Sequence, residues 1–210
     1  MVKLRMVKKN LVLIFDFDGT IADTINFIRT VFDFPEMKNI DWEELKDKGA
    51  REAFRSLGVS LAEIPFILKK ARNLLYKEVE KIKPIEGMEK ALLEIKKRSS
   101  QIGILTSCSR KTVEKFLQIN NLNFFDFIYS EGDIFNKAKR LNGLLKEKRL
   151  DPQCVFYIGD ETRDVEAAKT AGVKTIAVTW GFNSEKILRK QSPDYLVRQP
   201  QELVALLDNF

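Results

Sequence analysis

Residues 11–20, LVLIFDFDGT, join an apolar run to two aspartates. Five apolar residues precede Asp16, and Asp18 follows two positions later, just before Gly19 and Thr20. Side chains two positions apart in a strand point the same way, so Asp16 and Asp18 should share one side, and Gly19 lets the chain turn sharply after them. The stretch therefore predicts a buried strand that ends in paired carboxylates.

Five further runs of strand-forming residues follow, and most of them are continuously apolar, as in strands buried on both faces of a parallel sheet. Helical patterns separate the later runs, so strand and helix alternate from about residue 87 onward. This alternation predicts an α/β fold with a Rossmann-like, doubly wound parallel sheet. The predicted strands are residues 11–17, 101–107, 127–130, 155–160, 175–180 and 195–197.

The first strand is followed by a long helical stretch instead of a second strand. Capping-box patterns at residues 41–44 and 60–63 mark helix starts, and Gly58 ends the helix between them. Apolar residues at helical spacing from Ile64 to Ile82 predict one long amphipathic helix. We therefore expect an all-helical subdomain inserted into an α/β core. The expected boundaries are 22–83 for the subdomain, and 1–21 with 84–210 for the core.

The composition excludes several kinds of active site. The chain has no histidine, which excludes Ser-His-Asp triads, histidine zinc sites and phosphohistidine chemistry. Its two cysteines, Cys108 and Cys154, form no CxxC pair and fit a reducing cytoplasm. No apolar stretch approaches the ~20 residues of a membrane-spanning helix, so no membrane partner is expected. The net charge of +6 would suit an anionic partner, but lysines gather on predicted helices, so nucleic acid is not an expected partner.

Polar residues stand where the predicted strands end, which is where open α/β sheets bind ligands. Four aspartates gathered there would repel one another unless a cation lay among them, and oxygen ligands without histidine or thiolate favour Mg²⁺. A hydroxyl and an ammonium would then suit the oxygens of a phosphoryl group. The residues concerned are Asp16, Asp18, Thr106, Ser107, Lys137, Asp160 and Asp164.

Four short motifs resemble, in order and setting, those of the haloacid dehalogenase-like hydrolase superfamily. They are DFDGT at 16–20, Thr106 in ILTS, Lys137 in FNKAKR and GDETRD at 159–164. More closely, GDETRDVEAAKTAG followed by AVTWGF resembles the phosphoglycolate-phosphatase-like branch, and the predicted helical insertion matches that branch's helical cap. The resemblance covers nearly the whole chain.

By this resemblance, Asp16 is the nucleophile that forms an aspartyl-phosphate, while Asp18 protonates the leaving alcohol and then activates water. Asp16, Asp160 and the backbone carbonyl of Asp18 would hold the Mg²⁺. Asp164 would support the site through a water or by orienting the phosphate-binding lysine. The remaining implied residues are Thr106, Ser107 and Lys137 for phosphate binding, with Lys137 fitting the family spacing better than Lys139, and Gly19 in support.

The expected function is hydrolysis of a small phosphorylated metabolite, with phosphoglycolate as one candidate. A phosphohexomutase of the same superfamily, a phosphonate-cleaving enzyme with a cap lysine, a receiver-like signalling domain and a non-catalytic phosphate-binding protein are the alternatives. The substrate and the oligomeric state are not specified by the sequence.

Several assignments stay open between catalysis and packing. Thr106 and Ser107 could instead cap the helix that begins near Ser109. Trp42 is expected in the core, and Phe182 could either pack there or border the pocket.

Overall fold

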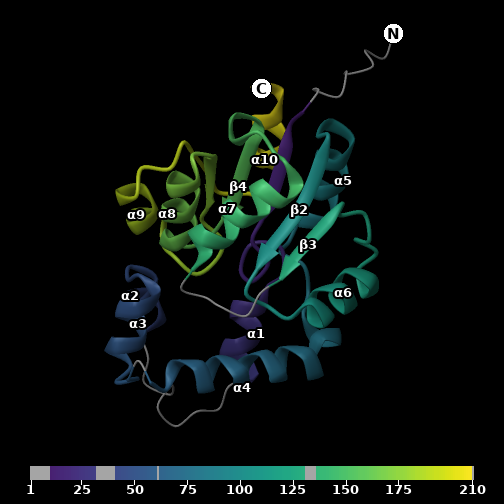
Figure 1. The fold of residues 1–210 in the computed structure, drawn as a ribbon. Helices are drawn as coiled ribbons and strands as arrows, with labels where there is room; N and C mark the ends of the chain where they lie inside the picture. The colour runs from purple at the N-terminus through teal and green to yellow at the C-terminus, as the bar shows by residue number, and fades with distance from the viewer. Residues whose placement is uncertain (1–9, 32–40, 61, 131–135, 210) are drawn as a thin grey trace.

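A computed structural model describes residues 10–31, 41–60, 62–130 and 136–209 of the 210-residue chain. Six parallel strands form one sheet in the order β3-β2-β1-β4-β5-β6 (Figure 1). All six predicted strands are present, and the α/β fold with a doubly wound parallel sheet is confirmed. The strands are β1 (Val12–Phe15), β2 (Gln101–Thr106), β3 (Phe127–Ser130), β4 (Val155–Gly159), β5 (Lys174–Val178) and β6 (Tyr195–Val197).

The first strand lies at the centre of the sheet. Phe15 is in register with Ile104 of β2 on one side and with Ile158 of β4 on the other. All four residues of β1 are buried, which explains why the run is continuously apolar instead of alternating. The residues that follow β1 therefore emerge in the middle of the carboxyl edge of the sheet.

Helices cover both faces of the sheet. Leu13 and Phe15 point into the larger core cluster with α5, α6 and α10, whereas Val12 and Ile14 point into a second cluster with α7 and α8. This alternation produces the three-layer arrangement of a doubly wound fold. The helices of the core are α5 (Met88–Arg98), α6 (Arg110–Ile119), α7 (Lys137–Lys148), η3 (Pro152–Cys154), α8 (Thr162–Ala171), α9 (Glu185–Lys190), α10 (Pro200–Leu206) and η4 (Leu207–Asn209).

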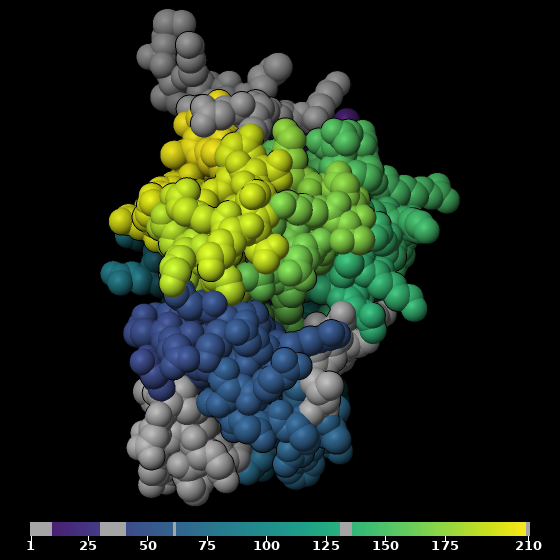
Figure 2. Space-filling model, turned by 90° about the vertical axis from the view of Figure 1, so that its left-hand side faces the viewer, coloured from purple at the N-terminus to yellow at the C-terminus, as the bar shows by residue number. Residues whose placement is uncertain are grey.

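The helices between β1 and α5 lie beyond the carboxyl ends of the strands (Figure 1). We call them the helical insert: α1 (Thr24–Val31), α2 (Trp42–Lys46), α3 (Ala50–Ser56), α4 (Ile64–Lys77) and η2 (Val79–Lys81). In the space-filling view the insert, coloured purple to blue, packs against the green and yellow core (Figure 2). None of the helices in the described ranges is long and apolar enough to cross a membrane.

The chain enters and leaves the insert at adjacent points. The backbone N–H of Asp23 donates to the carbonyl of Lys83, and that of Ile85 donates to the carbonyl of Ile21, both at 2.9 Å. An isolated antiparallel bridge between Ala22 and Pro84 lies between these two hydrogen bonds. The two connecting segments therefore run side by side.

The long helix of the insert is shorter than predicted. Pro65 lies in the first turn of α4, as expected, but α4 ends at Lys77 and the chain continues as the short η2. Because α4 ends at Lys77, the chain changes direction and the side chains of Val79 and Ile82 pack in the larger core cluster, where both are almost fully buried. The predicted helix ends at Gly58 and Gly172 are confirmed: Gly58, two residues after the end of α3, and Gly172, directly after α8, both have φ of +70°.

Candidate active site

The loop after β1 is held in place by the chain's own backbone. The N–H of Asp16 donates to the carbonyl of Ile158 at 2.8 Å, which ties the loop to β4. Gly19 then adopts φ of +74°, and a Cβ at this position would lie only 2.4 Å from Asp160 Oδ2. Glycine is therefore required here both for the turn and for the close approach to Asp160.

Lys137, the first residue of α7, bridges two of the predicted aspartates. Its Nζ lies 2.5 Å from Asp16 Oδ2 and also donates to Asp164 Oδ1, and all three side chains are buried. Burial lowers the pKa of Lys137, but Asp16 and Asp164 together raise it by more, so its pKa stands well above the ordinary value and it remains an ammonium. Lys139, the other candidate, is exposed.

Asp160 follows β4 and is completely buried. Its Oδ1 accepts a hydrogen bond from Thr20 Oγ1 and its Oδ2 accepts one from the N–H of Phe182, both at 2.7 Å. Burial, followed by the nearby carboxylates of Glu161 and Asp164, raises the pKa of Asp160 well above its ordinary value. Ionising Asp160 in this position is thus costly without a compensating cation.

Asp164 sits in the first turn of α8 and completes a cluster of buried carboxylates. Its Oδ2 accepts from the N–H of Glu161 at 2.9 Å, so Asp164 also caps the start of α8. Burial raises the pKa of Asp164 to about 6, against the lowering effect of Lys137. One oxygen each from Asp16, Asp160 and Asp164 lies within 4.8 Å of the others.

This cluster fits a divalent cation. The carboxylates are hard oxygen ligands, the raised pKa values of Asp160 and Asp164 show the cost of gathering their charges, and the two hydrogen-bond donors to Asp160 are neutral. The expected metal ligands were Asp16, Asp160 and the backbone carbonyl of Asp18. The cluster of side chains in the structure contains Asp16, Asp160 and also Asp164. Both oxygens of each of these three carboxylates accept a hydrogen bond, so hydrogen bonding alone does not rank them as ligands.

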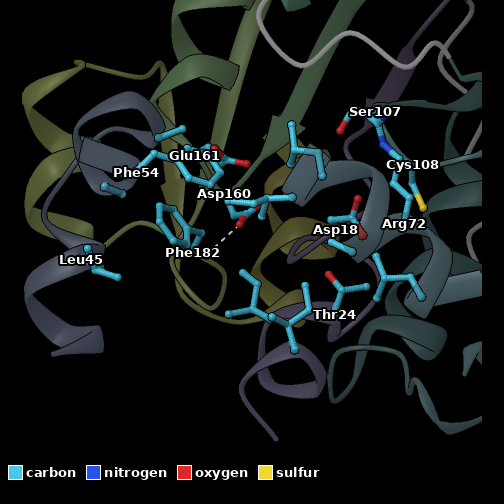
Figure 3. Close-up of a pocket in the computed structure, with 18 of the residues that line it drawn as sticks. Asp18, Thr24, Leu45, Phe54, Arg72, Ser107, Cys108, Asp160, Glu161 and Phe182 are labelled. Carbon is cyan, nitrogen blue, oxygen red and sulfur yellow. Dashed lines mark hydrogen bonds between the residues drawn. The ribbon is translucent and has the colours of Figure 1, made fainter. Parts of the chain in front are cut away.

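Asp18 faces the cavity that lies between the strand ends and the insert (Figure 3). Its Oδ1 is buried and has no hydrogen-bond partner within the described part of the chain. Burial, and then the neighbouring Asp16, raise the pKa of Asp18 to about 7. A carboxyl with this pKa holds or releases a proton near neutral pH, as an acid/base catalyst must.

The end of β2 contributes Thr106 and Ser107. Thr106 is fully buried, and its Oγ1 accepts from the N–H of Cys108 at 2.9 Å, while Ser107 lines the cavity. Neither residue caps α6, as one interpretation of the sequence proposed, because Ser109 is the N-cap and accepts from the N–H of Thr112 at 3.2 Å. Thr106 and Ser107 are therefore left at the edge of the site.

Two buried residues that hold the site in place were missed in the sequence. Arg140 donates to the carbonyl of Thr106, and its position three residues after Lys137 on the same helix face was a usable signal. The Nδ2 group of Asn183 donates to the carbonyls of Lys46 at 3.0 Å and Lys48 at 2.8 Å. Its Oδ1 accepts from the N–H of Thr162 at 2.8 Å, so Asn183 ties the end of α2 to the start of α8. No local pattern indicated its distant partners.

The cavity has a volume of about 290 Å³ and lies, partly open, between the carboxyl edge of the sheet and helices α1 to α4 (Figure 3). Phe182 lines it, which settles the choice left open for this residue. The expectation that Trp42 belongs to the core is wrong: it lines the cavity, with the guanidinium of Arg29 4.7 Å from its ring centroid. Trp42 leaves the core because it begins α2 in the insert, which turns it toward the strand ends.

Comparison with known proteins agrees with this geometry. The model of haloacid dehalogenase-like hydrolases matches residues 13–178, which span the sheet from β1 to β5. The chain belongs to this family. A phosphoglycolate phosphatase from Synechococcus elongatus is 32% identical over 91% of this chain and 94% of its own length. A pyrophosphatase PpaX from Bacillus mycoides is 27% identical over 97% of this chain and 99% of its own.

A solved structure of a haloacid dehalogenase-like family hydrolase from Streptococcus pneumoniae shows the same fold, with a TM-score of 0.77 at 23% identity over 94% of this chain and 98% of its own. The resemblance stated from the four motifs is confirmed, including its phosphoglycolate-phosphatase-like branch. The protein is thus a phosphatase-type hydrolase of the haloacid dehalogenase-like family.

Proposed function

We propose that the protein hydrolyses a small phosphomonoester with the help of Mg²⁺, through an aspartyl-phosphate on Asp16. The observation that carries this proposal is that two neighbouring carboxylates, Asp16 and Asp18, lie in different electrostatic environments. Asp16 is held against an ammonium at 2.5 Å, whereas Asp18 lines the cavity, has a pKa of about 7 and has one buried oxygen without a hydrogen-bond partner in the described part of the chain. The environment of Asp16 suits a nucleophile, and that of Asp18 suits an acid/base catalyst.

In the first step the Asp16 carboxylate attacks phosphorus, and the bond from phosphorus to the ester oxygen breaks. Asp18 gives its proton to that oxygen, so the alcohol leaves neutral. In the second step a water attacks the phosphorus of the aspartyl-phosphate and gives its proton to Asp18. This releases phosphate, frees Asp16 and restores the protonated Asp18, so the cycle balances.

Charge on the transferred phosphoryl group is met by groups at the strand ends. Lys137 keeps its charge through the cycle, and we assign Thr106 and Ser107, at the end of β2, to the phosphoryl oxygens. Asp16 and Asp160 would hold Mg²⁺, which when bound neutralises charge on the phosphoryl oxygens. Asp164 keeps Lys137 in position through their direct contact.

We further propose that residues 22–83 form a cap domain over a core made of residues 1–21 and 84–210. The adjacent entry and exit of the insert, with hydrogen bonds from Asp23 to Lys83 and from Ile85 to Ile21, support this division. A cap over the carboxyl edge would exclude water during transfer. A cytoplasmic location stays a prediction that agrees with the free thiols of Cys108 and Cys154.

The test is phosphate release from a panel of small phosphomonoesters, including phosphoglycolate, with Mg²⁺ or with a chelator. Asp16→Asn should reduce turnover by at least about 10³-fold, since a carboxamide cannot replace the nucleophile. Asp151→Asn is the matched control, because Asp151 is exposed and precedes β4 at the opposite edge of the sheet. Metal-independent release, or full activity in Asp16→Asn, would refute the proposal.

The same panel separates hydrolysis from the alternative of phosphoryl transfer within a sugar. Incubation with sugar 1-phosphates should yield free sugar and phosphate in equal amounts. Accumulation of an isomerised sugar phosphate would instead identify a phosphohexomutase.

A further inference from the structure

We infer that the substrate carries a small apolar organic group, alkyl or aromatic, on its phosphate. The inference rests on the proposed phosphatase function and names the substrate class of the same site. It follows from the wall of the cavity opposite the catalytic aspartates.

The cavity has two chemically different sides. Asp18, Asp160 and Ser107 line the side at the strand ends (Figure 3). The facing side is supplied by four helices of the insert, and its described part is mostly apolar. Representative residues are Ile25 and Ile28 of α1, Trp42 of α2, Phe54 of α3, and Ile67 and Leu68 of α4. If the phosphate of a substrate lies at the strand ends, its organic group will therefore contact the apolar side chains of the insert.

Two arginines also line the cavity, but neither adds an unmatched charge to its apolar side. Arg163 donates to Glu161 at 2.5 Å, so its charge is already matched within the wall. Arg72 lies beside Ser107 and Cys108 (Figure 3), on the side of the cavity where the phosphoryl group would sit. The part of the wall formed by α1, α2 and α3 is thus the apolar end of the cavity.

This environment discriminates between classes of phosphate ester. A second carboxylate or phosphate pushed against the apolar side chains would lose its hydration, and a sugar would leave several hydroxyls unsatisfied. An alkyl or aryl group would instead be stabilised by removal from water. The volume of about 290 Å³ lies at the lower limit of small-molecule pockets, ~300–1,000 Å³, so the group must be small.

The first test uses the unmodified protein and a series of ethyl, butyl and hexyl phosphates with Mg²⁺. Their leaving alcohols are similar in acidity, so differences in kcat/KM report contacts with the wall. We expect kcat/KM to rise about fourfold for each added methylene until the cavity is full. We also expect butyl phosphate to be preferred over phosphoglycolate, glycerol phosphate and pyrophosphate.

A pair of variants on neighbouring helices locates the effect. Phe54→Asn places an amide in the wall and should lower the ratio of kcat/KM for butyl phosphate to that for ethyl phosphate roughly tenfold. Phe66→Asn is the matched control, since Phe66 is 71% exposed on α4 and does not line the cavity. Circular dichroism would verify that both variants are folded, and the alkyl series stands independently of them.

The outcomes distinguish a failure of the apolar-substrate inference from a failure of the proposed phosphatase function. Metal-dependent release with a flat chain-length profile, or with phosphoglycolate or pyrophosphate preferred, would overturn this inference and leave the phosphatase function intact. An equal loss in Phe54→Asn and Phe66→Asn would also overturn it. No release from any ester would refute the proposed function itself.

Discussion

The carboxyl edge of the sheet and the wall formed by the helical insert border the same cavity, but they are organised differently. At the edge, buried charges are held by short, directional contacts, such as those of Asp160 with Thr20 and with the N–H of Phe182 at 2.7 Å. The wall consists of apolar side chains from four helices, which act through area and shape. The edge should therefore tolerate almost no substitution, whereas substitutions in the wall should change substrate preference gradually.

The largest effect on stability is expected at Lys137. Lys137→Met leaves Asp16 and Asp164 buried without their ammonium, which should cost about 3–5 kcal/mol of stability and reduce turnover by roughly 10²–10³-fold. Thermal unfolding and phosphate release measure both consequences. Lys139→Met, on the exposed side of the same helix, is the control. If both variants lost activity equally, Lys137 would not hold the role assigned to it.

Two glycines with left-handed backbones compare the edge with the insert directly. Gly19→Ala forces a Cβ to within 2.4 Å of Asp160 Oδ2, whereas Gly58→Ala, also at φ of +70°, meets nothing within 4 Å. We expect Gly19→Ala to lose about 2–5 kcal/mol of stability and most of its activity, and Gly58→Ala to lose about 1 kcal/mol and keep its activity. Similar losses in unfolding free energy would show that the contact with Asp160 is unimportant.

Asp18 should make stability depend on pH when the metal is removed. Its folded pKa of about 7 lies above the ordinary 3.8, so the folded state resists ionisation and is destabilised relative to the unfolded chain as pH rises from about 4 to 7. Asp18→Asn escapes this cost. Compared with the unmodified protein, Asp18→Asn should have the same free energy of unfolding below pH 4. Above pH 7 its free energy of unfolding should be higher by a few kcal/mol, at most about 4.

Chemical denaturation in chelator at several pH values would measure this difference. Added Mg²⁺ should reduce the advantage of Asp18→Asn, because the cation offsets the carboxylate charge. A difference between the two proteins that did not vary with pH would contradict the assigned pKa.

The smallest effect is expected where the two regions are joined. Asn183→Ala removes three hydrogen bonds between the start of α8 and the end of α2, and should cost about 1–3 kcal/mol. Asn26→Ala is the control, because Asn26 is exposed and its Nδ2 donates to the nearby carboxylate of Asp23 at 3.0 Å. Equal unfolding free energies for the two variants would show that the junction is not stabilised by Asn183.

The sequence indicated which aspartates gather at the edge because their motifs follow directly after a strand. Asp16, Asp18 and Asp160 needed only the position of β1 and β4 to be placed together, and the spacing of the family motif favoured Lys137 over Lys139. The fold was predicted for the same reason, since continuous apolar runs are a local signal of parallel strands.

What the sequence did not predict depends on contacts between distant segments. Trp42 has the composition of a core residue, and only the packing of α2 over the sheet turns it toward the cavity. Asn183 bonds to backbone carbonyls 137 and 135 positions away, which no spacing rule can indicate. The end of α4 at Lys77 likewise reflects the burial of Val79 and Ile82 in the core and not the periodicity of the helix.

The paired segments at the base of the insert have a consequence for how such an enzyme can diversify. The bond from Ile85 to Ile21 at 2.9 Å closes the insert into a loop whose two ends are already joined. Lengthening a closed loop costs only about 0.6 kcal/mol for each doubling, so the sheet is nearly indifferent to what lies between these residues. The insert can therefore be exchanged or rebuilt as a module, and a new substrate range can arise while the catalytic residues stay where they are.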